Sequence, residues 1–142
     1  MSTLFSKIIN GEIPGRFIWS DETCVAFLSI GPLRDGHTLV VPRAEIDEFT
    51  DADDALLTHL NLVAAKIGRA QKRAFNAARA GLMIAGFEVP HLHVHVWPTN
   101  SLADFDLSNA AVNPDPARMD QNAAALREAL REDGYAQFVP AG

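Results

Sequence analysis

The sequence Pro90-His-Leu-His-Val-His-Val-Trp97 carries three of the five histidines of this chain, at His91, His93 and His95. Successive side chains of a β-strand point to opposite faces, so histidines at every second position would share one face. The intervening side chains would fill the other face and pack on a core: Leu92, Val94 and Val96. In a helix the three imidazoles would be separated by about 100° per residue and would not cluster. The stretch therefore predicts a strand that presents a row of imidazoles.

Four further strands are predicted in the sequence around this one. Two β-rich runs, 16–19 and 24–30, flank a polar turn, which is the pattern of a hairpin. A third run, 37–41, is stopped by Pro42, and a fourth spans 81–85. With the histidine strand they make about five strands, which is enough for one antiparallel sheet.

Two helices are expected beside the strands. Thr50 and Asp53 have the spacing of a capping box, and apolar residues then recur three and four apart as far as Ala74. A second, shorter helix is expected to begin near Pro116. The sequence therefore predicts an α+β fold, a five-stranded antiparallel sheet with one long and one shorter helix. Residues 1–142 are expected to form a single domain.

The composition disfavours several classes of function. With 48% hydrophobic and 21% charged residues, the chain is ordinary for a globular protein. A formal net charge of −6 disfavours binding along a nucleic acid. No segment has the pattern of a signal peptide or approaches the roughly 20 apolar residues of a membrane span, so a cytoplasmic protein without a membrane partner is expected. The single cysteine, Cys24, cannot form an internal disulfide and is expected to be an inert core thiol.

Three uses would suit a row of imidazoles. The first is a metal site, because imidazole is a common zinc ligand. However, 142 residues are too few for an eight-fold barrel with such a site, and a cupin-type site needs a nearby carboxylate, whereas the first one after His95 is Asp104. The second use is a hydrogen-bonded structural row. The third is nucleophilic catalysis, in which one imidazole attacks while its neighbours orient it or bind phosphate oxygens.

A phosphorus centre suits the third use. Imidazole is mostly neutral at pH 7, so one ring nitrogen keeps a lone pair for attack. The phosphohistidine that results is reactive enough for water to complete the turnover, and the neighbouring imidazoles can supply positive charge to the phosphate oxygens. Phosphoryl or nucleotidyl transfer is therefore the chemistry that this row of residues favours.

The stretch His91-Leu-His-Val-His-Val-Trp97 resembles the signature of the histidine triad (HIT) family of nucleotide hydrolases and transferases. Three more segments are similar to parts of that family: Phe5-Ser-Lys-Ile-Ile-Asn-Gly-Glu-Ile-Pro14, Ala26-Phe-Leu-Ser-Ile-Gly-Pro32 and Gly36-His-Thr-Leu-Val-Val-Pro42. In order and spacing the resemblance covers about residues 4–99. It implies a HIT-like core followed by a C-terminal loop and helix at 100–142.

The resemblance also implies an activity and an assembly. The protein would be a homodimer in which two sheets form one continuous sheet, and it would cleave a small purine nucleotide at the α-phosphate without a cofactor. His93 would be the nucleophile, His95 would contact the phosphate, and His91 would help to orient His93. The base and ribose pocket would be lined by Phe5, Ile8, Phe27 and Ile30. For Ile8, simple core packing is the alternative.

Four positions decide whether a zinc ion is expected. Some bacterial members of the family bind zinc through residues that correspond here to Thr3, Ser6, Glu45 and His91. Three of these four are not the cysteine or histidine ligands of those members, so the sequence predicts no metal.

Two further departures from the family concern the substrate. Ser29 stands where the family commonly has an acid that holds the ribose hydroxyls, and a serine cannot grip both of them as a carboxylate does. Just before the triad, Phe87 and Glu88 replace a glutamine and a small hydroxyl residue. Glu88 would either repel an anionic substrate or pair with a triad histidine and raise the pKa of that imidazole.

The sequence thus predicts a nucleotide-binding hydrolase or nucleotidyl transferase. Its substrate would be a nucleoside phosphoramidate, an adenylate or a dinucleoside polyphosphate, cleaved through a covalent nucleotidyl-histidine at His93. The alternative is a catalytically weak nucleotide-binding or regulatory protein, which the changes at Ser29, Phe87 and Glu88 would favour. A metal-dependent hydrolase is a third hypothesis.

Overall fold

A five-stranded antiparallel sheet organises the chain in the computed structural model, which describes residues 2–142. The strands are β1 (Phe17–Ser20), β2 (Cys24–Leu28), β3 (Thr38–Pro42), β4 (Arg79–Met83) and β5 (Val94–Thr99). Their order in the sheet is β1-β2-β3-β5-β4, so β1 and β4 form the edges. The five predicted strands and the α+β fold are confirmed.

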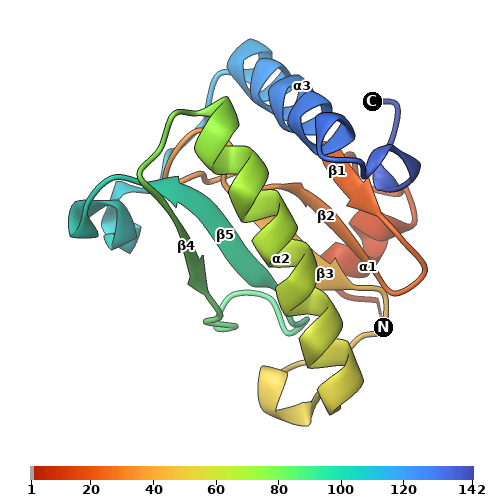
Figure 1. Cartoon of the computed structure of the whole chain (residues 1–142). Coiled ribbons are helices and arrows are strands. Elements are labelled where there is room, and N and C mark those ends of the chain that lie inside the picture. The colour runs from red at the N-terminus through yellow and green to blue at the C-terminus, as the bar shows by residue number, and fades with distance from the viewer. Residues whose placement is uncertain (1) are drawn as a thin grey trace.

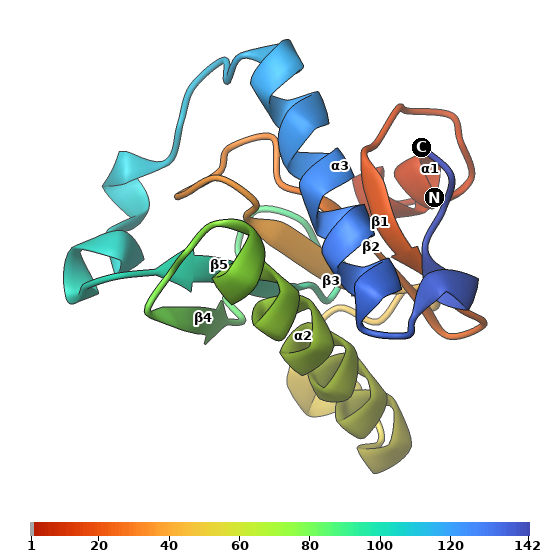
Figure 2. The ribbon, with the colours of Figure 1, turned by 45° about the horizontal axis from the view of Figure 1, so that its top comes forward.

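Three α-helices flank this sheet (Figures 1 and 2): α1 (Leu4–Ile9), α2 (Asp54–Ala74) and α3 (Pro116–Glu132). The two longer helices, α2 and α3, lie on one face, and α1 lies on the other. Short 3-10 turns complete the chain: η1 (Phe49–Asp51), η2 (Leu102–Phe105), η3 (Leu107–Asn109) and η4 (Ala136–Phe138). Within residues 2–142, no helix is both long enough and apolar enough to cross a membrane.

The start of α2 differs from the sequence prediction. Thr50 lies in the turn η1 and does not cap the helix. The cap is Asp53, whose carboxylate accepts a hydrogen bond from the amide of Leu56 at 2.8 Å. The expected capping box was therefore wrong, because the chain makes a 3-10 turn first. The start of α3 at Pro116 is as predicted, since proline suits the first turn of a helix.

Each face of the sheet has its own apolar cluster. The larger cluster lies between the sheet and the two long helices, and it includes Leu92, Val94 and Val96 from the histidine stretch. The smaller cluster lies on the α1 side: Phe5, Ile8, Val25, Phe27, Leu39 and Val41. The predicted alternation of the histidine stretch is confirmed, because its apolar members face α2 and its histidines face α1.

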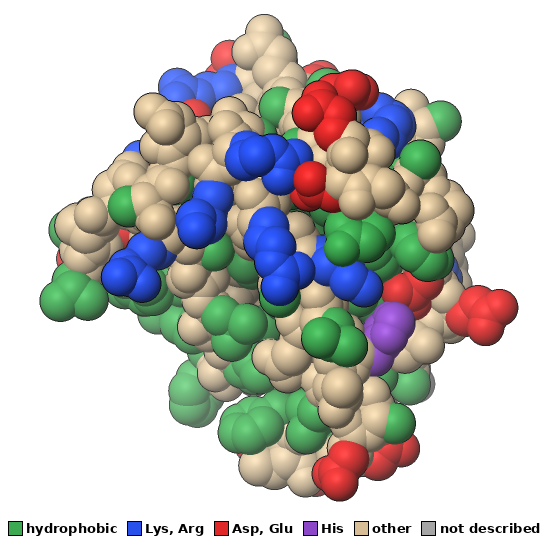
Figure 3. All heavy atoms as spheres, viewed as in Figure 1, with side chains coloured by type: hydrophobic (Ala, Val, Ile, Leu, Met, Phe, Trp, Pro, Cys, Tyr) green, Lys and Arg blue, Asp and Glu red, His purple; other side chains and the backbone are tan. Residues whose placement is uncertain are grey.

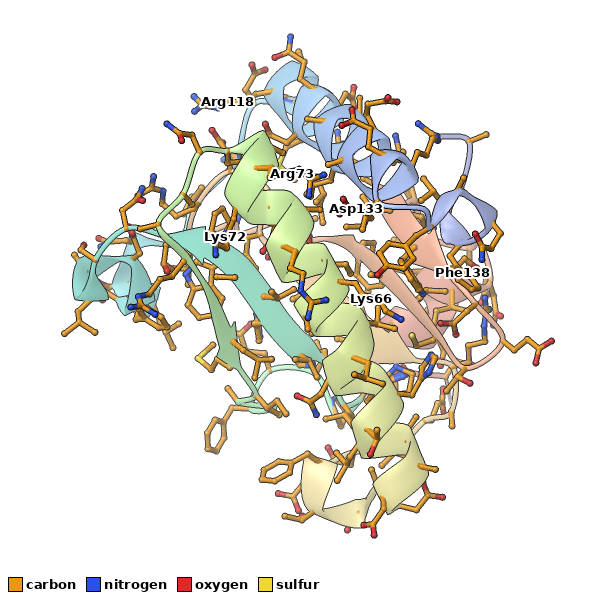
Figure 4. All side chains as sticks on the ribbon, in the orientation of Figure 1. Lys66, Lys72, Arg73, Arg118, Asp133 and Phe138 are labelled. Atoms are coloured by element: carbon orange, nitrogen blue, oxygen red, sulfur yellow. The ribbon has the colours of Figure 1, made fainter. Side chains whose placement is uncertain are left out.

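Lys and Arg side chains gather over the C-terminal half of α2, whereas the surface of α3 carries both acidic and basic side chains (Figure 3). Part of this charge holds the two helices together, since Arg73 of α2 forms an ion pair of 3.0 Å with Asp133 after α3 (Figure 4). Lys66 lies 5.2 Å from the ring centroid of Tyr135, which is a cation–π contact. The basic residues near the end of α2 also suit the negative end of the helix dipole.

Candidate active site

The triad lies where the chain enters β5. This strand begins at Val94, so only His95 of the three histidines is part of it. The strand that the sequence predicts from His91 onward thus begins too early. The reason is a loop contact, because the amide of Leu92 donates to the carbonyl of Ile46 at 2.6 Å.

The three imidazoles nevertheless form one cluster on the α1 side of the sheet. The ring centroids of His93 and His95 are 4.9 Å apart. The ring of Phe5 of α1 packs edge-on against two of the imidazoles. Its centroid is 4.8 Å from that of His93 and 5.8 Å from that of His91. The short helix α1 therefore supplies an apolar wall that holds His91 and His93 in place.

Only one ring nitrogen of His93 has a hydrogen-bond partner among residues 2–142. Its Nδ1 lies 2.7 Å from the carbonyl oxygen of His91. A carbonyl only accepts, so Nδ1 carries the proton and Nε2 keeps its lone pair. Burial lowers the pKa of His93, and this outweighs the opposing effects of the His91 carbonyl and the negative charge of Glu88. His93 is thus a neutral imidazole with a lone pair at Nε2, which is what a nucleophile requires.

His91 is fixed from both of its ring nitrogens. Nε2 lies 2.7 Å from the carbonyl oxygen of Pro42 and must donate to it. In the neutral ring, Nδ1 then accepts from the hydroxyl of Thr3, at 2.6 Å. His91 is fully buried, and its carbonyl is the one that orients His93. The hydrogen bond from His91 to His93 runs through the His91 carbonyl, so the orienting role predicted for His91 would act through its backbone.

Thr3 belongs to a hydrogen-bonded network with Ser6 and Glu45. The hydroxyl of Thr3 accepts from the Ser6 amide, capping α1. The carboxylate of Glu45 accepts from the Ser6 hydroxyl at 2.5 Å and from the Thr3 amide at 3.0 Å. These contacts lower the pKa of Glu45.

This donor set does not fit a zinc ion. Zinc in proteins is bound by thiolate, imidazole and carboxylate groups. Two of the four positions, Thr3 and Ser6, carry neutral hydroxyls, and each group already has a partner within the network. In place of metal coordination, a hydrogen bond from the Thr3 hydroxyl links the N-terminal segment to His91.

A fourth histidine completes the cluster, and the sequence reasoning missed it. His37 stands just before β3, and its Nε2 lies 2.9 Å from Nδ1 of His95. Because Nδ1 of His37 accepts from the amide of Leu33 at 3.0 Å, its Nε2 carries the proton and donates to His95. In neutral His95 the proton is therefore on Nε2. The signal for this role was a histidine beside Gly36 at the start of an otherwise apolar strand.

The protonation states of this pair follow from burial. Burial, then the neighbouring His95, lower the pKa of His37 to about 3. Burial, then the neighbouring His93, lower the pKa of His95 to about 4. Both rings are neutral at pH 7, so His95 offers a neutral Nε2–H donor.

The residues predicted to line a base and ribose pocket divide into two groups. Phe5, Ile8 and Phe27 are buried in the α1-side cluster, with the rings of Phe5 and Phe27 at 5.6 Å. Phe5 also contacts His93, so it connects this cluster with the triad. Ile30 lies outside the cluster and is 80% exposed.

The positions that depart from the family lie in loops. The hydroxyl of Ser29 accepts from the amide of Gly31 at 3.2 Å. Phe87 is 97% exposed, and Glu88 is also exposed. Among the described residues Glu88 forms no ion pair with a triad histidine. Its charge acts to raise the pKa of His93, but burial outweighs it, so the pKa of His93 is lowered and not raised.

A second polar cluster joins β1, β2 and α2, and none of its residues belongs to the triad. Asp21 accepts from Trp19 Nε1 at 2.8 Å and lies 2.7 Å from His59 Nε2. Burial alone would raise the pKa of Asp21, but these donors and the Cys24 and Thr23 amides lower it to about 2. Burial raises the pKa of the Cys24 thiol. The cluster is closed by its own hydrogen bonds, and Cys24 is the core thiol that the sequence predicts.

Known proteins share this sequence pattern and fold. The HIT domain model matches residues 10–102. An uncharacterized HIT-like protein of Methanocaldococcus jannaschii is 39% identical over 99 residues, which cover 67% of this chain and 77% of that protein. A zinc-bound histidine triad family protein of Mycobacterium smegmatis is 28% identical, with a TM-score of 0.79 and coverage of 96% and 98% of the two chains.

Two other solved structures have names that state a function. A hypothetical histidine triad nucleotide-binding protein of Sulfolobus tokodaii is 27% identical, with a TM-score of 0.75 and coverage of 90% of this chain and 91% of that one. A HIT family hydrolase of Legionella pneumophila is 29% identical, with a TM-score of 0.62 and coverage of 71% and 96%. The family thus includes hydrolases. By its sequence, its fold and its histidine cluster, the present chain belongs to the HIT domain family.

Proposed function

We propose that the protein binds a small purine nucleotide and hydrolyses or transfers it at the α-phosphate. The substrate class would be a nucleoside phosphoramidate, an adenylate or a dinucleoside polyphosphate. The observation that carries this proposal is the state of His93, whose Nδ1–H is bound by the His91 carbonyl so that the Nε2 lone pair is free. Membership of a family that includes nucleotide-binding proteins and hydrolases supports the same substrate class.

The reaction would proceed in two displacements. In the first, Nε2 of His93 forms a bond to the α-phosphorus while the bond to the amine or phosphate leaving group breaks. The leaving group takes its electron pair and a proton from a water molecule, because neutral His95 would become an anion if it gave up its single N–H and so only hydrogen-bonds the phosphate. The hydroxide that remains takes up the proton released by the water that attacks in the second step. In the second, water attacks the α-phosphorus, the nucleotidyl-His93 bond breaks, and a nucleoside monophosphate is released.

The hydrogen bonds support different roles for His95 and His91 in the proposed reaction. His95 would donate from Nε2 to a phosphate oxygen, because His37 occupies its Nδ1. His91 would keep His93 in the required orientation through its carbonyl. Phe5, Ile8 and Phe27 would supply the apolar side of the nucleotide site, with Ser29, Ile30 and Glu88 at its rim.

A regulatory nucleotide-binding protein is the second candidate. It is favoured by the loop residues Ser29 and Glu88, since the Ser29 hydroxyl is engaged with the Gly31 amide. An exposed carboxylate at Glu88 would also repel the phosphates of a substrate. Such a protein would bind a nucleotide and turn it over slowly or not at all.

The two candidates differ in turnover. Steady-state hydrolysis of an adenosine phosphoramidate should be measured beside the binding of adenosine monophosphate by calorimetry. Turnover that is lost in His93→Gln supports the enzyme. Binding without turnover supports the regulator, and hydrolysis that a chelator abolishes would favour a metal-dependent hydrolase. Glu88→Ser restores the small hydroxyl residue that the family has at this position and removes the charge that would repel the phosphates. If the protein is an enzyme, this variant should have a lower KM.

We also propose that two copies join through β4 into one continuous sheet. β4 is an edge strand, and an unpaired edge can accept a second strand. Leu82 of β4 is about half exposed and lines a groove between β4 and α2. Sedimentation should show a dimer at micromolar concentration and a monomer for Leu82→Asp, with Leu102→Asp as the control. A monomeric wild-type protein would contradict the dimer.

A further inference from the structure

Gln71 is a polar side chain in the apolar interface between α2 and the sheet. Its relative exposure is 0%. The side-chain amide nitrogen lies 2.9 Å from the carbonyl oxygen of Gly36 and 2.9 Å from that of Val96. Gly36 immediately precedes His37, and Val96 immediately follows His95. One amide group of α2 thus binds the backbone next to each of the two histidines that contact each other.

The two bound carbonyls lie where β3 and β5 stop pairing. Thr38 and Val96 are the last pair of this ladder on that side, since Gly36 turns away from the sheet with a φ of +87°. A positive φ suits glycine, and here the glycine also lets α2 approach. A Cβ at Gly36 would come within 2.3 Å of the ring of Phe75. Phe75 is the C-cap of α2, four residues after Gln71, so α2 and its cap contact this turn at two points.

The Gln71 contacts are not explained by packing alone. Both hydrogens of its amide are used by the two carbonyls, which fixes the orientation of the group. The other end, Oε1, is buried and has no hydrogen-bond partner in residues 2–142. A buried acceptor without a partner is unfavourable, and an apolar side chain of similar volume would avoid that cost. What Gln71 adds over such a side chain is the pair of bonds to Gly36 and Val96.

We infer that Gln71 is a positioning residue that fixes the hydrogen bond from His37 to His95. By holding both backbones at the end of the ladder, it keeps Nε2 of His37 at 2.9 Å from Nδ1 of His95. That bond leaves the proton of His95 on Nε2, on the side of the triad. This inference rests on the proposed function for its kinetic effect, but the arrangement of the two histidines does not depend on any substrate.

The variant Gln71→Met tests the inference, because methionine fills a similar volume without donors. In the free protein, the ring-nitrogen NMR spectrum should show that the proton of wild-type His95 stays on Nε2. In Gln71→Met the His95 resonances should shift towards those of an imidazole that exchanges between its two tautomers. The turnover number should fall at least tenfold with KM changed less than threefold.

The control is Leu126→Ala, which truncates a fully buried side chain of α3. It destabilises the core without touching the ladder, and it should leave the His95 resonances and kcat unchanged. If Gln71→Met does not fold, Phe75→Leu loosens the other α2 contact with Gly36 and is measured in the same way. An unchanged His95 spectrum in the folded variant overturns the inference, whether or not the protein turns over a nucleotide. If the His95 spectrum changes in Gln71→Met but the wild-type protein does not turn over a nucleotide, the inference is supported and only the proposed function is contradicted.

Discussion

The histidines differ in what binds their ring nitrogens, although three of them come from one repeating pattern. A backbone carbonyl holds His93 and leaves Nε2 free, whereas His91 is bound at both nitrogens. His95 takes its tautomer from His37, which immediately precedes β3. The partners of His91 and His95 are far away in the sequence, whereas the partner of His93 is the carbonyl of His91, two residues before it.

Thr3 offers a test of the hydrogen-bonded network that joins it to Ser6, Glu45 and His91. Thr3→Val keeps the shape of the side chain but removes the hydroxyl that binds His91 and caps α1. We expect a loss of about 1–2 kcal/mol in the free energy of unfolding and a fall in kcat of about tenfold. Denaturant unfolding and steady-state kinetics measure the two effects. Thr3→Ser retains the hydroxyl and should behave as the wild type; a normal kcat in Thr3→Val would mean that Pro42 alone holds His91.

Sequence reasoning identified the triad but not all of its partners. Alternation along one strand is a local pattern, and it correctly grouped His91, His93 and His95. The contact of His37 with His95 depends on the pairing of β3 with β5, which no local pattern specifies. Similarly, Gln71 reads as an ordinary polar residue of a helix until the packing of α2 is known.

The elements were predicted more accurately than their ends. All five strands were found from apolar runs and turn residues, but β5 begins at Val94 because the preceding backbone binds the loop at Ile46. The short helix α1 was not predicted, since six residues give too little periodicity to detect. Its stability comes from contacts with the sheet, which lie far away in the sequence.

The start of α2 can be tested by mutation, because the structure has Asp53 as the N-cap whereas the sequence predicts a capping box that begins at Thr50. Asp53→Ala removes the carboxylate that accepts from Leu56, and should lower the free energy of unfolding by about 1 kcal/mol. Thr50→Ala should change it by less than about 0.5 kcal/mol, because Thr50 makes no cap contact. Urea denaturation of both variants measures the difference. A larger effect at Thr50 would restore the capping box that the sequence suggested.

At the scale of the whole molecule, the buried imidazoles make stability depend on pH. The pKa values of His37 and His95 are lowered from 6.5 to about 3 and 4, and that of His93 is also lowered. The unfolded chain therefore binds protons below about pH 6.5 that the folded protein does not bind. This stability is fully present above pH 6.5 and is lost as the pH falls towards the folded-state values.

Urea unfolding at pH 7 and pH 5 tests this linkage. His37 alone should account for a loss of about 2 kcal/mol over that interval. The lowered carboxyl pKa values, such as about 2 for Asp21, act at lower pH and do not interfere. The variant His37→Gln should show a smaller loss between the two pH values. Equal stability at pH 5 and pH 7 would show that these rings accept protons in the folded state.

The role of His93 is tested most directly by trapping the covalent intermediate. The protein is mixed with an adenosine phosphoramidate, quenched in alkali and digested for mass spectrometry. We expect an adenylyl group on the peptide that contains His93, no such group in His93→Gln, and a fall in turnover of about 1,000-fold or more in that variant. Turnover without an adduct, together with full activity in His93→Gln, would contradict nucleophilic catalysis by this residue.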